Sequence, residues 1–305
     1  MNRLRVIVIV FTAFVIFQSC KQKPAKVVQQ ETTLVGSATF IADESCQPIV
    51  DEVNYVFTHL NTKADIKILY RPENDVLRLL LNDSIRLAIL TRDLKADEIK
   101  ILKDRNLPPD VHRFAVDAIT LIVNKASNDT LISVSEIKKM LNGKTKTNVN
   151  VVFDNANSSL ARYLKEFSGN NDFKLKNVFA LKNNKEVIKY VSSHPGTIGI
   201  TGFSWLNDPD DDYKEAVNNV KIVSVKDEAS KSAPDEYFKP SQTTLALKQY
   251  PLTRGLYVVN CTGKRGLGTG FTYYIVNEQG QRIILRSGIL PDSIPQRLIN
   301  IKNTL

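Results

Sequence analysis

Three short polar segments of this 305-residue chain carry side chains that could bind a small anion. They are Asp43-Glu44-Ser45, Thr91-Arg92-Asp93 and Asn155 to Ser159, and each lies between an apolar run and a stretch with helical periodicity. The first N–H groups of a helix lack an internal partner and carry the positive end of its dipole, so they favour a negative ligand. Hydroxyls and an arginine beside them add donors. The candidate ligand-binding residues are therefore Glu44, Ser45, Thr91, Arg92, Asn157, Ser158 and Ser159.

The clearest of the three segments follows the run from Val149 to Phe153, whose β-branched and aromatic residues predict a buried strand. Ser158 and Ser159 then offer the side chains that begin a helix. The apolar residues after them fall on one helical stripe, namely Leu160, Tyr163, Leu164 and Phe167. We hypothesise that this helix start forms half of an oxyanion site. An ordinary capped helix has the same pattern, so this segment alone does not decide between the two.

The rest of the chain alternates between predicted strands and helices. Strands are expected at residues 32–39, 65–70, 85–90, 116–123, 149–153, 197–200 and 221–225. Helices are expected at residues 48–60, 72–81, 96–104, 133–141, 158–167, 185–191 and 271–286. We expect loops at 40–46 and 205–219, a turn at 266–270, and extended backbone at Leu245 and Leu247. This order predicts an α/β fold with mostly parallel sheets and helices on both faces, in which ligands bind at the carboxyl ends of strands.

Several classes of function fit the composition poorly. The net charge is +9, but no basic stripe interleaved with aromatic residues appears, so we expect no nucleic-acid partner. His59, His112 and His194 are far apart and form no ligand pattern, so we expect no metal and no cofactor. The same absence of a nearby base makes a serine hydrolase the least favoured alternative. Cys46 and Cys261 could form a disulfide or remain two buried thiols.

The N-terminus has the features of an export signal. Arg3 and Arg5 precede an apolar run, residues 6–17, that is too short to span a membrane. Residues 17–20, Phe-Gln-Ser-Cys, resemble the lipobox of bacterial lipoproteins. This resemblance implies a signal peptide at 1–19, a lipidated Cys20, a flexible tether at 20–31, and a location on the periplasmic or cell-surface side of a membrane. A plain secretory signal or an uncleaved anchor is the alternative.

Five segments, taken in order, resemble the periplasmic phosphate-binding protein of ABC transporters, within the type II substrate-binding superfamily. These segments are residues 35–39, 85–92, 157–159, 196–200 and 280–291. The resemblance implies a two-lobed fold with a hinge cleft, in which lobe I comprises residues 32–118 plus 246–305 and lobe II residues 119–245. It places the chain crossings near residues 116–120 and 243–247. It also implies a monomeric, non-enzymatic protein that delivers phosphate or a related oxyanion to a permease.

The chain departs from this family at the second-lobe loop. Asp154 stands where family members commonly carry an arginine, and Ser159 and Leu160 replace a glycine and a threonine. A monoprotonated phosphate also donates a hydrogen bond, and a carboxylate acceptor would separate it from sulfate. The candidate acceptors are Asp43, Glu44, Asp93 and Asp154. These changes leave open a larger, less charged or cation-associated ligand, and use of the fold as a sensor or surface binding module.

Overall fold

The computed structural model describes residues 31–145, 149–173 and 175–293. The chain divides into two units, residues 1–30 and 31–305, and the account below concerns the second. The predicted signal peptide, Cys20 and the tether up to residue 30 lie outside the described residues. Among the described residues, no helix is long and apolar enough to cross a membrane.

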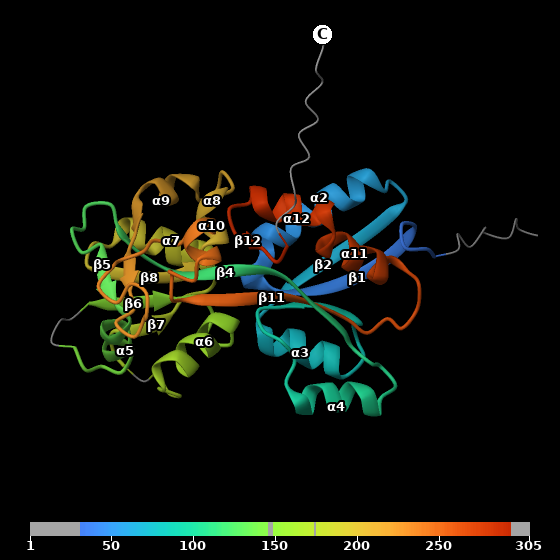
Figure 1. Ribbon diagram of the computed structural model, residues 1–305, viewed down its shortest axis with the longest axis horizontal. Helices are drawn as coiled ribbons and strands as arrows, with labels where there is room; N and C mark the ends of the chain where they lie inside the picture. Colours follow the sequence, from blue (N-terminus) through green and yellow to red (C-terminus); the bar gives the residue numbers. More distant parts are fainter. Residues whose placement is uncertain (1–30, 146–148, 174, 294–305) are drawn as a thin grey trace, which may run out of the picture. The chain divides into compact units, whose positions relative to one another are not determined.

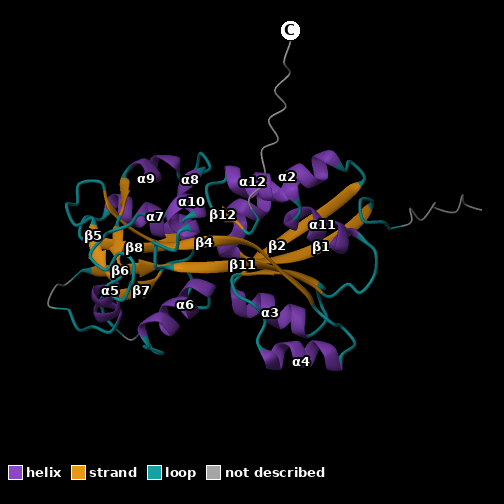
Figure 2. Ribbon diagram, in the orientation of Figure 1, coloured by secondary structure: helices purple, strands orange, loops and turns teal. Residues whose placement is uncertain are grey.

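The centre of the fold is a ten-stranded sheet whose main path runs β2-β1-β3-β11-β4-β8-β6-β7 (Figures 1 and 2). The strands of this path are β2 (Ala64–Arg71), β1 (Gly36–Asp43), β3 (Leu87–Leu90), β11 (Thr253–Asn260), β4 (Asp110–Asn124), β8 (Thr197–Gly202), β6 (Asn150–Phe153) and β7 (Val178–Ala180). Two short strands, β9 (Val220–Ile222) and β12 (Leu290–Pro291), also pair with β4. A separate parallel pair consists of β5 (Leu131–Ser133) and β10 (Ser224–Lys226).

The 15-residue strand β4 runs through both halves of this sheet. Its residues 110–118 pair with β11, and its residues 119–124 pair with β8 and β9. We call β1, β2 and β3 with their helices the first half, and β6, β7 and β8 with theirs the second half. Strand β1 is parallel to β2 and β3, and β6 is parallel to β7 and β8, whereas β4 and β11 are antiparallel to their neighbours. The predicted two-lobed α/β fold is confirmed, with a mixed sheet.

Helices cover both faces of the first half (Figure 1). They are α2 (Gln47–Leu60), α11 (Leu267–Val276) and α12 (Glu278–Arg286) on one face and α3 (Glu73–Leu81) and α4 (Ala96–Asp104) on the other. The helices of the second half are α5 (Val134–Leu141), α6 (Ser159–Ser168), α7 (Asn184–Ser193), α8 (Ser204–Asn207) and α9 (Lys214–Asn218). A further short helix, α10 (Gln242–Ala246), lies close to β12.

Strand β1 extends into the predicted loop at 40–46, so that prediction was wrong for residues 40–43. Successive residues of this strand enter different cores. Phe40 packs with α2 and α11, where its ring lies 5.4 Å from that of Phe271, and Ile41 packs with α3 and α4. Because both faces are covered, the strand carries apolar residues at successive positions rather than alternating with polar ones. The chain leaves the strand through a single 3₁₀ turn, η1 (Glu44–Cys46).

Four other local predictions were wrong. The expected helix 271–286 is two helices, because the extended backbone of Asn277 ends α11 and its side chain caps α12. The expected turn 266–270 already contains the first turn of α11. Residues 205–219 hold α8 and α9 and bury Trp205 and Tyr213 rather than forming a surface loop. Leu245 lies in α10 instead of extended backbone.

The two cysteines of the second unit are separate. Cys46 and Cys261 are both buried free thiols, so they do not form the disulfide that the sequence left open. Burial raises the pKa of the Cys261 thiol to about 11, which keeps this group protonated near neutral pH.

Candidate functional site

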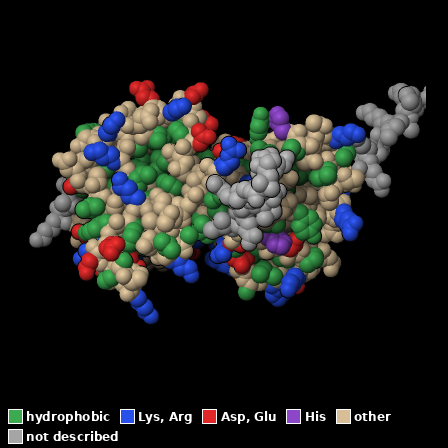
Figure 3. Space-filling model, turned by 45° about the horizontal axis from the view of Figure 1, so that its top comes forward, with side chains coloured by type: hydrophobic (Ala, Val, Ile, Leu, Met, Phe, Trp, Pro, Cys, Tyr) green, Lys and Arg blue, Asp and Glu red, His purple; other side chains and the backbone are tan. Residues whose placement is uncertain are grey.

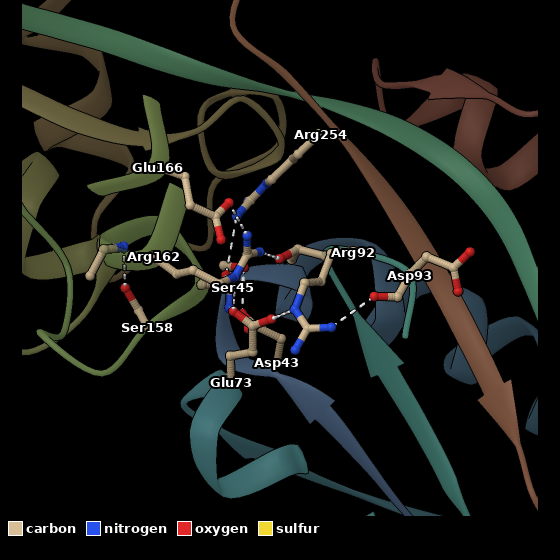
Figure 4. A network of polar contacts seen from close by, with 12 residues as sticks. Asp43, Ser45, Glu73, Arg92, Asp93, Ser158, Arg162, Glu166 and Arg254 are labelled. Atoms are coloured by element: carbon tan, nitrogen blue, oxygen red, sulfur yellow. Dashed lines mark hydrogen bonds and ion pairs between the residues drawn. The ribbon is translucent and has the colours of Figure 1, made fainter. Parts of the chain in front are cut away.

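The three predicted polar segments follow strands β1, β3 and β6 and meet between the two halves (Figure 4). Ser45 lies in the turn after β1, Thr91 directly follows β3, and Ser158 is the N-cap of α6. Ser45, Thr91 and Ser158 are all at least 97% buried. Their convergence is the arrangement that the strand-end argument predicts for an open α/β sheet.

A hydroxyl pair joins the halves directly, and we call it the serine contact. Ser45 Oγ lies 3.2 Å from Ser159 Oγ, and each residue is 1% exposed. Ser45 Oγ donates to Asp43 Oδ1 at 2.5 Å, so its only proton points away from Ser159. Ser159 therefore donates to Ser45, and the guanidinium of Arg254 lies behind it with Nη1 3.4 Å from Ser159 Oγ. The hydrogen bonds of the serine contact are thus all donated in one direction, from Arg254 through the two serines to Asp43.

Arg254 is a site residue that sequence reasoning missed. It stands near the start of β11, is 6% exposed, and bonds Asp117 Oδ2 of β4 through Nη2 at 2.8 Å and Nε at 3.1 Å. Burial alone would lower the pKa of its guanidinium, but the Asp117 carboxylate raises it above the usual value. The available signal was the period of two in β11, where Arg254 shares the buried positions of Leu256 and Val258. Arg254 thus brings a buried positive charge to the serine contact from another strand.

Asp154 organises the start of α6. Ser158 Oγ accepts from Ala161 N at 3.0 Å and donates to Asp154 Oδ1 at 2.5 Å. Asn184 Nδ2 donates to Asp154 Oδ2 at 3.2 Å. Asp154 is fully buried, and this burial raises its pKa to about 7 despite the hydrogen bond from Ser158. The carboxyl group therefore changes protonation near neutral pH.

Two acidic side chains near the serine contact retain unused acceptor oxygens. Among the described residues, Asp43 Oδ2 and Glu44 Oε1 are buried atoms with no hydrogen-bond partner. Burial, reinforced by the Asp43 charge, raises the pKa of Glu44 to about 7. The other acceptor candidate, Asp93, is exposed and bonds the N–H of Leu94. Asn157 is also exposed, so neither of these two residues belongs to the buried group.

A second polar contact joins the halves, and we call it the glutamate bridge. Glu73 of α3 lies between two arginines, with Oε1 2.9 Å from Arg92 Nε and Oε2 2.7 Å from Arg162 Nε. Its side chain is 2% exposed. Arg92 also bonds both carboxylate oxygens of Glu98 at 2.7 and 2.9 Å. The structure therefore places Arg92 in ion pairs rather than beside the serine contact.

Arg162 connects the glutamate bridge to the predicted strand end at Thr91. Its Nη2 lies 3.4 Å from Thr91 Oγ1, and its Nη1 bonds Glu166 at 2.9 Å. Sequence reasoning missed both Arg162 and Glu73. The signal for Arg162 was its position one helical turn after Ser158 and Ser159, on a helix already assigned to the site.

A cavity of about 180 Å³ opens beside the serine contact. The first half contributes Glu44, Gln47 and Tyr70 to its lining, and the second half contributes Asn183, Asn184, Lys185 and Trp205. Trp205 Nε1 donates to the carbonyl oxygen of Ser45 at 3.0 Å, so the indole is fixed against the residue that carries the contact. The cavity therefore adjoins the serine contact through Glu44, which precedes Ser45, and through Trp205.

The remaining candidates for chemistry lie elsewhere. In the described ranges, no group of three or more His, Cys, Asp or Glu side chains could hold a metal ion. The histidine rings contact local groups instead, with His59 near Tyr55 O, His112 near Asp110 and His194 near Tyr190 O. Lys and Arg side chains are scattered over the face drawn in Figure 3 and do not gather in a stripe.

A mixed α/β sheet in two halves, with buried hydroxyls meeting between them, is the arrangement of the periplasmic-binding-protein fold. The chain belongs to the family described as the PBP superfamily domain, which matches residues 27–279. It is 25% identical over 240 residues to the phosphate-binding protein PstS of Staphylococcus aureus, covering 74% of this chain and 68% of that protein. The predicted resemblance to the phosphate-binding proteins of ABC transporters is confirmed.

Solved structures share the same fold. A putative phosphate ABC transporter substrate-binding protein with bound phosphate from Clostridium perfringens is 17% identical, with a TM-score of 0.68 over 85% of this chain and 100% of that one. An ABC-type phosphate transport receptor from Vibrio cholerae is 15% identical, with a TM-score of 0.61 over 83% of this chain and 99% of that one. At these identities the likeness concerns the fold.

Proposed function

We propose that the chain is a lipid-anchored extracytoplasmic solute-binding protein that captures phosphate or a related oxyanion for an ABC transporter. The observation that carries this proposal is the serine contact, in which buried hydroxyls 114 positions apart lie 3.2 Å from each other beside Arg254. The names of the relatives, among them a phosphate-binding protein and phosphate transport receptors, support the same ligand class.

The serine contact has the chemistry that a dehydrated oxyanion needs. Hydroxyl rotors can turn from a carboxylate to an incoming anion without moving the backbone. The start of α6 adds backbone N–H groups with the positive end of the helix dipole, and Arg254 adds a buried positive charge. The unpartnered oxygens of Asp43 and Glu44 would accept the proton of a monoprotonated phosphate. Sulfate has no such proton near neutral pH, so these acceptors would favour phosphate.

Binding requires that the halves separate, because Ser45 and Ser159 touch each other in this structure. The two lobes that would move are residues 32–118 plus 246–305 and residues 119–245. Of the predicted ligand residues, Ser45, Ser159, Ser158 and Glu44 would meet the anion. Thr91 would contribute through Arg162, and Arg92 would position Glu73 rather than the ligand. Asn157 would act at the exposed rim of the site.

We also propose a location for the protein in the cell. Lipidation of Cys20 would hold this monomer on the periplasmic or cell-surface side of a membrane, within reach of a permease. A role as an enzyme is not supported, because a nucleophilic serine needs a base. The hydroxyls of Ser45 and Ser158 are bonded to carboxyls, and the histidines contact other groups.

Isothermal titration of phosphate tests the proposal. Ser159→Ala should weaken phosphate binding roughly 10- to 100-fold, because a hydrogen bond to a charged group contributes about 1.5–3 kcal/mol. Ser45→Ala should have a similar effect. Ser168→Ala is the matched control, since this serine lies at the other end of the same helix and bonds the carbonyl oxygen of Leu164.

Two results would contradict the proposed site. Phosphate affinity that stays the same in Ser45→Ala and Ser159→Ala would remove both hydroxyls from it. No heat of binding with phosphate, arsenate or sulfate would overturn the assignment of an oxyanion ligand.

A further inference from the structure

Two neighbouring cavities lie between the halves on the side of Glu44 and Trp205. The cavity of about 180 Å³ described above shares Gln47 and Trp205 with a second one of about 170 Å³. The second cavity is lined by the start of α2 on one side and by residues 204–213 on the other. A bare tetrahedral oxyanion at the serine contact would leave both cavities to water.

The second cavity is lined by four carboxylates, whereas the first is lined by Glu44 and the ion-paired Lys185 among neutral side chains. Carboxylates line them from both halves, namely Glu44, Asp51, Glu52, Asp208 and Asp210. Lys185 is the basic residue of the two linings among the described residues, and Asp210 and Asp212 hold its ammonium at 2.8 and 3.0 Å. Its charge is therefore already balanced. Burial and the nearby Asp208 charge raise the pKa of Glu52, a sign that negative charges are crowded in this region.

Glu44 connects the first cavity with the serine contact. It precedes Ser45 directly, lines the first cavity, and has a buried oxygen, Oε1, without a partner among the described residues. The preceding residue, Asp43, is fully buried and likewise has an unused oxygen. Buried carboxylate oxygens are costly when they stay unpaired, so a ligand that donates to them gains affinity.

We propose that the natural ligand is an oxyanion that carries an amino group, such as an aminoalkyl phosphate or phosphonate. The anionic group occupies the serine contact beside Arg254, and the ammonium enters the cavity beside Glu44 and Trp205. This inference rests on the proposed function and narrows its ligand class. An ammonium supplies three donors and a positive charge, which match the unpaired oxygen of Glu44 and the carboxylates of the adjoining second cavity. An aromatic wall is compatible with a cation.

Isothermal titration with three probes tests this inference on the purified protein. The probes are O-phosphoethanolamine, monoethyl phosphate and inorganic phosphate, of which the first two differ only in the amine. We expect O-phosphoethanolamine to bind at least about tenfold more tightly than monoethyl phosphate, as one charge-assisted hydrogen bond provides. Glu44→Gln should remove most of this preference, and Asp208→Asn, an exposed position, should reduce it to a smaller extent.

Glu236→Gln is the matched control, because this glutamate is exposed in the connection before α10 and should keep the full preference. Circular dichroism and the urea midpoint of each variant establish that it is folded. Equal affinities for O-phosphoethanolamine and monoethyl phosphate, or binding of inorganic phosphate alone, would overturn the proposal that the ligand carries an amino group. Neither result would contradict the oxyanion site. Failure of all three probes would instead overturn the proposed function, and the inference with it.

Discussion

The serine contact and the glutamate bridge join the same two halves, but only the bridge is made of opposite charges that face each other. In the glutamate bridge, each carboxylate oxygen of Glu73 faces an arginine, and both arginines have a further acidic partner. In the serine contact, two neutral hydroxyls meet while the adjacent Asp43 and Glu44 keep unused oxygens. The two contacts lie at the ends of neighbouring strands. They therefore differ in the chemistry of their groups rather than in how deeply these groups are buried.

This difference separates a contact that stabilises the arrangement of the halves from one whose groups can change partner. Charged groups that already face an opposite charge gain little from an added anion, which would have to displace a carboxylate. Hydroxyls with spare acceptors nearby can change partner at low cost. We infer that the glutamate bridge stabilises the closed arrangement, whereas the serine contact gives way to the ligand.

We expect the largest effect from removing the negative charge of Asp117, which holds Arg254 behind the serine contact. Asp117→Asn would leave a guanidinium whose side chain is 4% exposed without its ion-pair partner. Breaking a buried pair on one side costs about 3–5 kcal/mol, and we expect a loss of this size in the free energy of unfolding. Urea titration measures it. Asp75→Asn, which breaks the exposed pair with Arg78, is the matched control and should change stability by less than about 1 kcal/mol. Equal effects of the two variants would refute the structural role assigned to Asp117.

A smaller effect should appear as a dependence of stability on pH. Burial raises the pKa of Asp154 from 3.8 to about 7, so the folded protein binds more protons here than the unfolded chain between these values. The free energy of unfolding should therefore be highest below about pH 4 for this group and fall as the pH rises to 7, by up to ~3 kcal/mol. Glu44 should act in the same direction.

Urea titrations at a series of pH values measure this dependence. Asp154→Asn keeps an acceptor for Ser158 and should flatten the curve, since the amide does not titrate. If the free energy of unfolding of the wild type instead rose between pH 4 and 7, and this rise were absent in Asp154→Asn, folding would lower the pKa of Asp154. That result would contradict the assignment.

The smallest expected effect concerns the glutamate bridge itself. Glu73→Gln removes the negative charge from between Arg92 and Arg162, but both arginines keep a second acidic partner. We therefore expect the free energy of unfolding to fall by about 2 kcal/mol, which is less than the full cost of breaking a buried ion pair. The closed arrangement should become less populated, and small-angle X-ray scattering without ligand should report a larger radius of gyration.

Glu166→Gln provides the control for the glutamate bridge. Glu166 bonds the same Arg162, but its side chain is 58% exposed, so its loss should cost less than about 1 kcal/mol. If Glu73→Gln were no more destabilising than Glu166→Gln, the bridge would not hold the halves together.

The sequence predicted the elements better than the interior connections. The three polar strand ends were identified because turn and cap residues followed clear apolar runs. Strand β1 was cut short at Thr39 because its last residues are buried on both faces and show no alternation. The break at Asn277 was missed because the apolar stripe continues across it while a side-chain cap ends one helix and begins the next.

The site shows the same limit. Ser45 and Ser159 could be found because each follows a strand within its own segment. The contact of Arg254 with Asp117 could not be assigned, because the two residues meet through the antiparallel pairing of β11 with β4, 137 positions apart. Sequence spacing gives no register for such a pairing. Arg92 lies in the loop after β3, and its partner Glu73 begins helix α3, so the sequence did not show that the arginine is held in an ion pair.

Strand β4 has a mechanical consequence for any motion between the halves. Its backbone continues from one half into the other without a loop, and where it passes between them Ile119 is held by Leu252 O at 2.8 Å and by the Tyr250 hydroxyl at 2.7 Å. Rotation of one half must therefore be absorbed as twist along a hydrogen-bonded ribbon, and the resisting torque grows with the angle. A loop would allow wide excursions, whereas this ribbon restricts the amplitude and returns the molecule towards its resting geometry.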